Sequence, residues 1–186
     1  MNNDNKTLYT LLVYSENIAG VLNQITAVFT RRQVNIESLN VSASSIEGVH
    51  KYTITAWSTQ DQIEKITKQI EKKIDVVKAK FYTDDQLFIR ETGLYKLSTQ
   101  TVLGNPEISR IIRRYDANIT EVNPTYVAVM KSGMTEDIVS LFRALNEFDC
   151  VLQYTRSGRI AITRSTEEEV SAFLEQQQKD YEDGKK

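Results

Sequence analysis

Two asparagines, Asn17 and Asn35, stand on either side of an amphipathic run, and Gly20 comes at the beginning of that run. An asparagine amide can both donate and accept hydrogen bonds, and glycine lets a ligand approach the backbone closely. The first amides of a helix attract a carboxylate. A free amino acid, which carries a carboxylate beside an ammonium, would suit such a set. Local chemistry alone favours the simpler interpretation, in which Asn17 is a helix cap, Gly20 accommodates the backbone and Asn35 is a turn residue.

The elements that must position these residues follow from hydrophobic periodicity. Leu22, Ile25 and Phe29 recur at helical spacing, with Val21 and Val28 beside them. Alternating or β-rich runs on either side predict strands. The resulting order, β-α-β-β-α-β, is the ferredoxin-like split unit. The predicted strands are 7–15, 35–44, 49–57 and 74–82, and the predicted helices are about 19–32 and 60–73.

The second half of the chain repeats this order with one extra strand. The segments "RRQVNIESLN" (31–40) and "RRYDANITEVN" (113–123) both follow a helix and place Asn-Ile at the start of a strand. Asn105 and Pro106 are a predicted N-cap and first helical residue, and Thr135 is a predicted cap. The predicted strands are 93–100, 118–122, 125–130, 150–155 and 159–164, the last two forming a hairpin at Ser157–Gly158.

The predicted fold class is therefore α+β, with two tandem ferredoxin-like βαββαβ domains. The domain boundary is expected near "TDDQ" (83–86). Thr166 and Glu169 have the spacing of a capping box, so a short helix is expected after the second domain. The predicted division is 1–84, 85–164, and a short helix with a polar tail over 165–186.

Composition and residue types argue against several functions. The 186 residues carry a net charge of -2, without the basic excess of a nucleic-acid binder. No apolar run approaches a membrane span, and the polar N-terminus is not a signal peptide, so a cytoplasmic protein is expected. His50 is the only histidine and Cys150 the only cysteine, and neither belongs to a metal-binding or catalytic cluster. We therefore expect no catalytic residues, no metal and no bound cofactor.

Several motifs resemble those of the acetolactate synthase (acetohydroxyacid synthase) small regulatory subunits. The segment "ENIAGVLNQITAVFTRRQVNIESLNV" (16–41) is similar to the N-terminal signature of that family, with "NIESL" (35–39) a close match. "IEKKIDVVKA" (70–79) and "TRSGRIAITR" (155–164) are similar to later family segments. The resemblance implies that the first domain is an ACT domain, an amino-acid sensor that pairs with a second copy as a homodimer.

The resemblance also implies a binding site for valine, in some members leucine or isoleucine, between two ACT domains. Asn17, Gly20 and Val21 would come from one subunit, and Asn35 and Ile36 from the other. Ala19 and Gln33 depart from the residues that the family favours at these positions. The expected effector-binding residues are Asn17, Ala19, Gly20, Val21, Asn35 and Ile36.

The function that the resemblance implies is regulatory. The chain would bind a large catalytic subunit, which carries thiamine diphosphate, Mg²⁺ and FAD, and would activate it and make it sensitive to valine. A stand-alone amino-acid sensor acting on another partner fits the ACT pattern equally well. An independent enzyme on a ferredoxin-like scaffold is a third possibility, for which the sequence offers no catalytic set.

Overall fold

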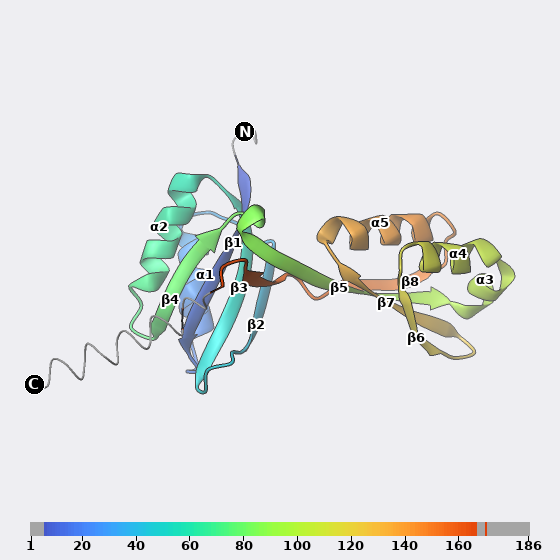
Figure 1. Ribbon diagram of the computed structural model, residues 1–186, viewed down its shortest axis with the longest axis horizontal. Coiled ribbons are helices and arrows are strands. Elements are labelled where there is room, and N and C mark those ends of the chain that lie inside the picture. The colour runs from blue at the N-terminus through green and yellow to red at the C-terminus, as the bar shows by residue number, and fades with distance from the viewer. Residues whose placement is uncertain (1–5, 167–169, 171–186) are drawn as a thin grey trace, which may run out of the picture. The chain divides into compact units, whose positions relative to one another are not determined.

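Two units make up the chain in the computed structural model, which describes residues 6–166 and 170. The first, unit 1, extends to Phe88 and also includes the segment that begins at Ala161. The second, unit 2, is Ile89–Ile160. Figure 1 shows a sheet and helices in each. No helix within residues 6–166 and 170 is long and apolar enough to cross a membrane.

Unit 1 has the predicted β-α-β-β-α-β order around an antiparallel sheet. Its strands lie in the order β2-β3-β1-β4, so β2 and β4 are the edges. The elements are β1 (Thr7–Glu16), α1 (Val21–Arg31), β2 (Ser38–Ala43), β3 (Val49–Ser58), α2 (Gln60–Glu71) and β4 (Val76–Tyr82).

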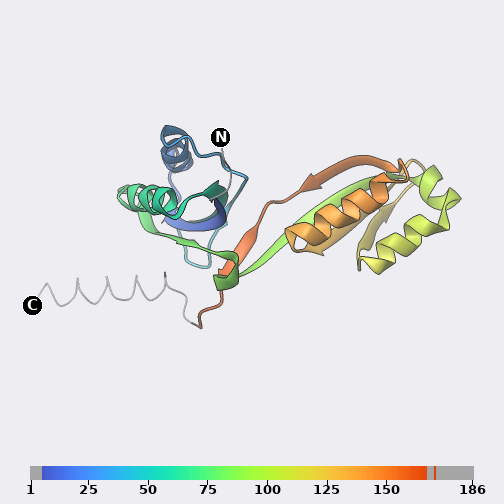
Figure 2. The same ribbon diagram turned by 90° about the horizontal axis from the view of Figure 1, so that it is seen from above.

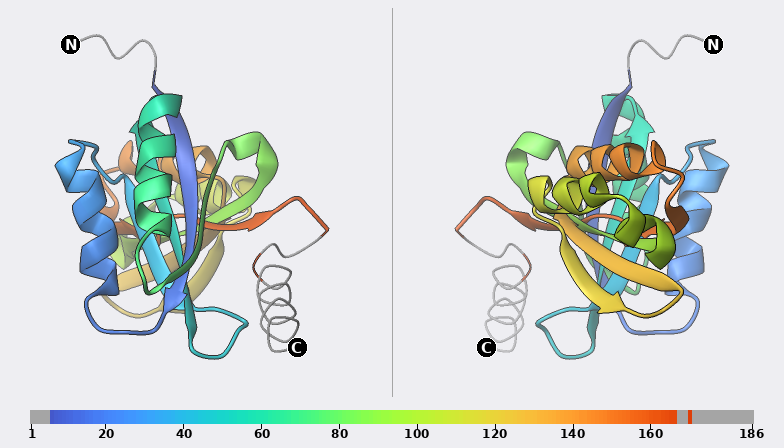
Figure 3. Two further views of the ribbon diagram at one scale, coloured as in Figure 1. Left: turned by 90° about the vertical axis from the view of Figure 1, so that its left-hand side faces the viewer. Right: turned by 90° about the vertical axis from the view of Figure 1, so that its right-hand side faces the viewer.

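The core of unit 1 lies between the sheet and its two helices. Leu11 of β1 packs in one buried cluster with Ile25 of α1 and Ile66 of α2, because alternate strand residues and every third or fourth helical residue face the same layer. The left view of Figure 3 shows α1 in blue and α2 in teal. The hydroxyl of Thr59 accepts a hydrogen bond from the Gln62 N–H at 3.3 Å and so caps α2.

Unit 2 repeats the same topology. Its sheet has the order β6-β7-β5-β8, and β9 also pairs with β5. Figure 2 shows α4 and α5 lying along the strands of this unit. The matching strand orders confirm the predicted α+β fold of two tandem ferredoxin-like units. The elements from Asp84 onward are the 3₁₀ helix η1 (Asp84–Gln86), β5 (Leu87–Ser98), α3 (Thr99–Gly104), α4 (Pro106–Arg114), β6 (Asn118–Val122), β7 (Tyr126–Gly133), α5 (Thr135–Asn146), β8 (Val151–Arg156) and β9 (Ile160–Thr163).

The repeated phrase of the two halves corresponds to the same turn in each unit. Gln33 follows α1 with a φ of 54°, and Asp116 follows α4 with a φ of 51°. The N–H groups of Val34 and Ala117 then donate to carbonyls of the preceding helices, those of Phe29 and Ile112. Left-handed residues commonly end helices in this way, and glycine adopts that conformation most readily.

The predicted hairpin at Ser157–Gly158 is wrong. Both β8 and β9 pair with β5, so the chain continues along the same strand instead of reversing. Ser157 keeps the chain beside β5, because its N–H donates to Thr92 O at 2.9 Å and its hydroxyl accepts from Thr92 N–H at 3.0 Å. Gly158 has a φ of 76°, which makes a local break between the two strands rather than a turn.

The predicted starts of the helices agree with the structure in one case and differ in others. Asn105 is confirmed as the N-cap of α4 and Pro106 as its first residue. Thr135, however, is the first residue of α5, and Met134 is its N-cap. α1 begins two residues later than predicted, at Val21. α3 was not predicted, since its six residues are too few to show a helical period.

The C-terminal prediction cannot be compared in the same way. Most of the predicted short helix and polar tail, 165–186, lies outside the described residues. The predicted domain division at 84–85 and 164–165 stays a prediction.

Candidate functional site

The N-terminus of α1 lacks the side-chain cap that α2, α3 and α4 have. Gly20 is its N-cap, with a φ of 94°, and no side chain within the described chain accepts a hydrogen bond from the first turn. The first turn contains no acidic residue either. By contrast, the Asn105 side chain caps α4 by accepting from Glu107 N–H at 3.0 Å. The partial positive charge at the start of α1 is therefore not satisfied by the helix's own side chains.

Asn17 is not the cap that a local interpretation would allow. It lies in the exposed loop before α1, and its backbone N–H donates to Gly48 O at 3.0 Å. Ala19 and Gly20 are exposed in the same loop. A Cβ built on Gly20 would meet no atom within 4 Å, so the backbone here opens onto free space. The Asn17–Gly48 bond ties this loop to the turn between β2 and β3.

Two of the predicted site residues belong partly to the core. Val21 is 1% exposed and packs in the hydrophobic core of unit 1. Its N–H has only a long contact of 3.4 Å to Ile18 O. Ile36 is half-buried and packs against the same core. Val21 can therefore contribute its backbone to an external ligand, whereas its side chain is already enclosed.

Asn35 and Ile36 come after α1, at the end opposite to Gly20. They precede β2, which begins at Ser38 rather than at the predicted residue 35. The 11 residues of α1 span about 16 Å at 1.5 Å per residue. A single copy therefore does not bring Asn17 and Asn35 to one ligand the size of an amino acid.

The edge strand β2 offers unpaired backbone groups. Within the described chain β3 is its only neighbour. The Ser44 N–H donates to Val49 O at 2.9 Å and fixes the phase of the antiparallel ladder. Because hydrogen-bonded and non-hydrogen-bonded pairs alternate, the N–H and C=O groups of alternate residues point away from β3. These residues are Leu39, Val41 and Ala43.

A cavity of about 350 Å³ adjoins Asn35. The α1–β2 connection supplies one side, and Trp57 near the end of β3 supplies another. Trp57 is 49% exposed, although it is a large aromatic residue. Lys6 and Glu37 line the same cavity, and neither forms an ion pair with any residue of the described chain. Sequence reasoning missed Lys6, Glu37 and Trp57; the only signal was a tryptophan in a strand of alternating polarity.

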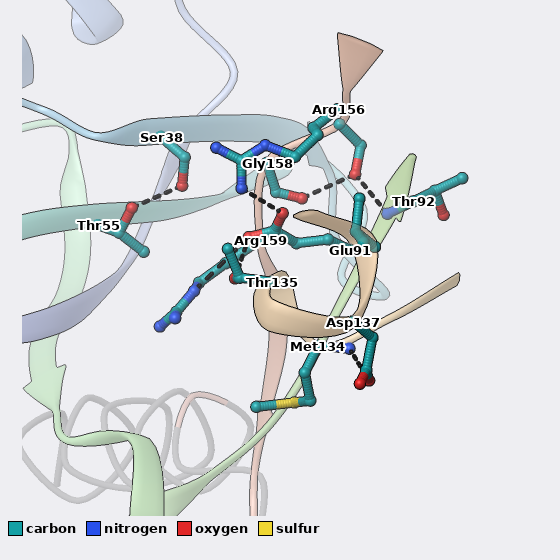
Figure 4. A network of polar contacts seen from close by, with 12 residues as sticks. Ser38, Thr55, Glu91, Thr92, Met134, Thr135, Asp137, Arg156, Gly158 and Arg159 are labelled. Carbon is teal, nitrogen blue, oxygen red and sulfur yellow. Dashed lines mark hydrogen bonds and ion pairs between the residues drawn. The ribbon is translucent and has the colours of Figure 1, made fainter. Parts of the chain in front are cut away.

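A second polar cluster lies in unit 2 and is buried. Glu91 of β5 is 3% exposed and forms ion pairs with Arg156 at 3.1 Å and Arg159 at 3.7 Å. The Thr135 hydroxyl donates to the same carboxylate at 2.8 Å. Figure 4 shows these side chains converging from β5, the β8–β9 connection and the start of α5. The cluster fixes the course of the chain between β8 and β9.

Other candidate groups have structural roles. Cys150 is fully buried, and its thiol donates to Leu145 O at 3.2 Å. Burial raises the pKa of the Cys150 thiol, which opposes formation of a reactive thiolate. Among residues 6–166 and 170, no group of three or more His, Cys, Asp or Glu side chains could hold a metal ion.

The two units match two family models. Residues 11–78 match the model described as "AHAS small subunit-like ACT domain". Residues 90–165 match the model described as "Small subunit of acetolactate synthase". The matches divide between the units in the same way as the two sheets.

Whole-chain relatives give the same result. The chain is 33% identical over 172 residues to the acetolactate synthase small subunit of Bacillus subtilis, covering 90% of this chain and 95% of that protein. It is 30% identical over 154 residues to the small subunit of Haemophilus influenzae, covering 83% and 94%. The structure of the small subunit from Thermotoga maritima superimposes with a TM-score of 0.77 at 23% identity, over 86% of this chain and 99% of that one.

Proposed function

We propose that this chain, which belongs to the acetolactate synthase small-subunit family, binds a catalytic large subunit, activates it and makes it sensitive to valine. The chain itself would supply no catalytic group. Thiamine diphosphate, Mg²⁺ and FAD would be held by the large subunit. The observation that carries the valine-binding part is the position of the two asparagines at opposite ends of α1, beside a strand with a free edge.

Two copies can bring these ends together. If the free edges of two β2 strands pair antiparallel about a two-fold axis, the start of one β2 lies beside the end of the other. Asn35 precedes the start of β2, and the loop of Asn17 and Gly20 is tied through Gly48 to the turn beyond its end. The pairing would therefore place Asn35 of one copy near Gly20 of the other. It would form two equivalent sites in each homodimer.

The chemistry of such a site suits a free amino acid. The uncapped first turn of α1 would receive the carboxylate. The side-chain amides of Asn17 and Asn35 would bond the remaining polar groups. Ile36, half-buried beside Asn35, would provide apolar surface for an aliphatic side chain. Because both copies build each site, the ligand would stabilise the pair of ACT domains.

Regulation requires more than binding. Valine can shift the activity of the holoenzyme only if it binds two states of the assembly with different affinity. A coupling free energy of about 1–3 kcal/mol, or roughly 5–150-fold in affinity, is typical of such systems. We expect valine to inhibit the reconstituted enzyme through a coupling of this size.

The test is an activity assay of the purified chain reconstituted with its large subunit, with and without valine. Gly20→Asp would place a carboxylate where the ligand's carboxylate binds; aspartate is also among the residues that best tolerate a positive φ. The expected result is activation without valine inhibition. Gly104→Asp, an exposed glycine with open space around it in unit 2, is the control and should keep normal inhibition.

Two outcomes would contradict the proposal. If the wild-type chain leaves the activity of the large subunit unchanged, it is not an activating subunit. If Gly20→Asp gives the same inhibition curve as the wild type, the valine site is elsewhere.

A further inference from the structure

The cavity beside Asn35 contains groups that the family resemblance does not assign to any site. We infer that Glu37 binds the ammonium group of the effector and that the Trp57 ring forms a wall for its aliphatic side chain. This inference rests on the proposed function, because it adds residues to the half of the site that surrounds Asn35.

Charge is the first argument. The cavity is lined by one carboxylate, Glu37, and one ammonium, Lys6. Neither has an ion-pair partner within the described chain. The unpaired carboxylate of Glu37 is complementary to the ammonium group of an amino acid. In the proposed dimer the ligand's carboxylate is directed to the first turn of α1 in the other copy, which leaves its ammonium for Glu37.

The exposed tryptophan is the second argument. Trp57 is 49% exposed, although large aromatic side chains gain strongly from burial. The Glu37 N–H donates to Thr55 O at 2.8 Å, so the segment before β2 stays beside β3, and Asn35 and Trp57 line the same cavity. The ring therefore stands next to the segment that carries both Asn35 and Ile36. An aliphatic ligand in the cavity would cover apolar surface of the ring that is now open to solvent.

Cavity size is the third argument. About 350 Å³ lies within the usual range for small-molecule sites, which begins near 300 Å³. The cavity is lined by both polar and apolar groups, as such sites are. A branched-chain amino acid fits this combination of volume, charge and an aromatic wall.

Trp57 provides a direct readout, because it is the only tryptophan in the chain. Valine is titrated into the full-length wild-type chain at a concentration at which sedimentation shows it to be dimeric. Binding is measured by calorimetry and by the intrinsic fluorescence of Trp57. The expected result is a saturable change in emission with the same Kd as the calorimetric one.

The role of Glu37 is tested with Glu37→Gln, which keeps the size of the side chain and removes its charge. Loss of a hydrogen bond to a charged group should weaken valine binding roughly tenfold or more. Binding of 3-methylbutanoate, which is valine without its amino group, should be no weaker than in the wild type. Asp85→Asn removes a carboxylate from an exposed position of unit 1 outside this cavity, and it should leave valine affinity unchanged.

Each outcome decides between the claims. If valine gives heat but Trp57 emission does not change and Glu37→Gln binds as tightly as the wild type, this inference is wrong while the proposed valine site stands. If the wild-type dimer gives no heat with valine, the proposed valine site and this inference both fail.

Discussion

Arg159 Nε lies 3.7 Å from Glu91 Oε1, and only 5% and 3% of the two side chains are exposed. The two residues are far apart in sequence but adjacent to the two points where the chain passes between the units, at Phe88–Ile89 and Ile160–Ala161. Arg156 binds the other carboxylate oxygen at 3.1 Å. One buried carboxylate thus fixes both the beginning and the end of unit 2.

Replacing Glu91 by glutamine should destabilise unit 2. The change removes the carboxylate that pairs with the buried guanidinium of Arg159, and breaking a buried ion pair typically costs about 3–5 kcal/mol. We expect a loss at the lower end of this range, because Arg156 is 38% exposed and its charge stays hydrated when the carboxylate is removed. Urea unfolding followed by far-UV circular dichroism measures the loss, while Trp57 fluorescence reports on unit 1 separately.

The matched control is Glu107→Gln, which breaks an exposed i,i+3 pair with Arg110 at 2.8 Å. That pair should contribute no more than about 0.5 kcal/mol. Equal losses in the two variants would contradict a special role for the buried carboxylate.

Tyr95 should make the chain sensitive to alkaline pH. Its hydroxyl donates to Ile138 O at 2.7 Å in the core of unit 2, and burial raises its pKa well above the ordinary 10.0. Above about pH 10 the unfolded state loses this proton while the folded state keeps it, so stability falls as pH rises. The slope from one such group is about 1.4 kcal/mol per pH unit.

Tyr95→Phe tests this sign. The variant should lose about 1 kcal/mol near neutral pH, where the hydrogen bond is missing. Its stability should then fall less steeply toward about pH 11 than that of the wild type. Burial also raises the pKa of Tyr154, so some alkaline loss remains in the variant. Identical slopes for variant and wild type in denaturant titrations would show that Tyr95 titrates normally.

Cys150 should be unreactive in the folded chain. It is fully buried, and burial raises the pKa of its thiol, so both access and thiolate formation are restricted. A disulfide reagent that releases a coloured thiolate should modify no thiol under native conditions and one thiol per chain in denaturant. Rapid modification of the native chain would show that the β8 side of unit 2 opens readily.

The helices illustrate what the sequence could predict. The predicted helix over 60–73 matches α2, and the predicted cap and first residue, Asn105 and Pro106, match α4; the buried residues of both helices are mainly isoleucines in a narrow stripe. In α1 the apolar residues cover a wider arc, so spacing alone did not define the buried face. Ile25 and Phe29 are buried as predicted, but Leu22 is 42% exposed and the stripe is completed by Val21 and Val28.

The strand β5 illustrates the opposite case. Its burial alternates from Leu87, but the buried position at residue 91 is occupied by a glutamate. A charged residue in a sequence usually indicates an exposed position, so the predicted strand began only at residue 93. The arginines that make this burial possible come from the other end of unit 2, and no local signal connects them.

The candidate site divides in the same way. The residue types of Asn17, Gly20 and Asn35 indicated a binding site for the carboxylate of an amino acid. The exposed, uncapped start of α1 supports that prediction. Their separation along α1 could not be seen from spacing in the sequence, because it depends on which end of a helix each loop occupies. The neighbours of Asn35 could not be predicted either. Trp57, for example, comes from β3 and lies close to Asn35 only in the folded sheet.

The central claim is that each valine site is built from two copies of the chain. The direct measurement is calorimetry on a heterodimer of Asn17→Ala and Asn35→Ala chains, purified with two different tags. Each variant homodimer should bind valine weakly, since both of its sites lack one asparagine. The heterodimer should regain one site of wild-type affinity, formed by the intact Asn17 of one chain and the intact Asn35 of the other. A heterodimer that binds no better than the two homodimers would contradict a shared site.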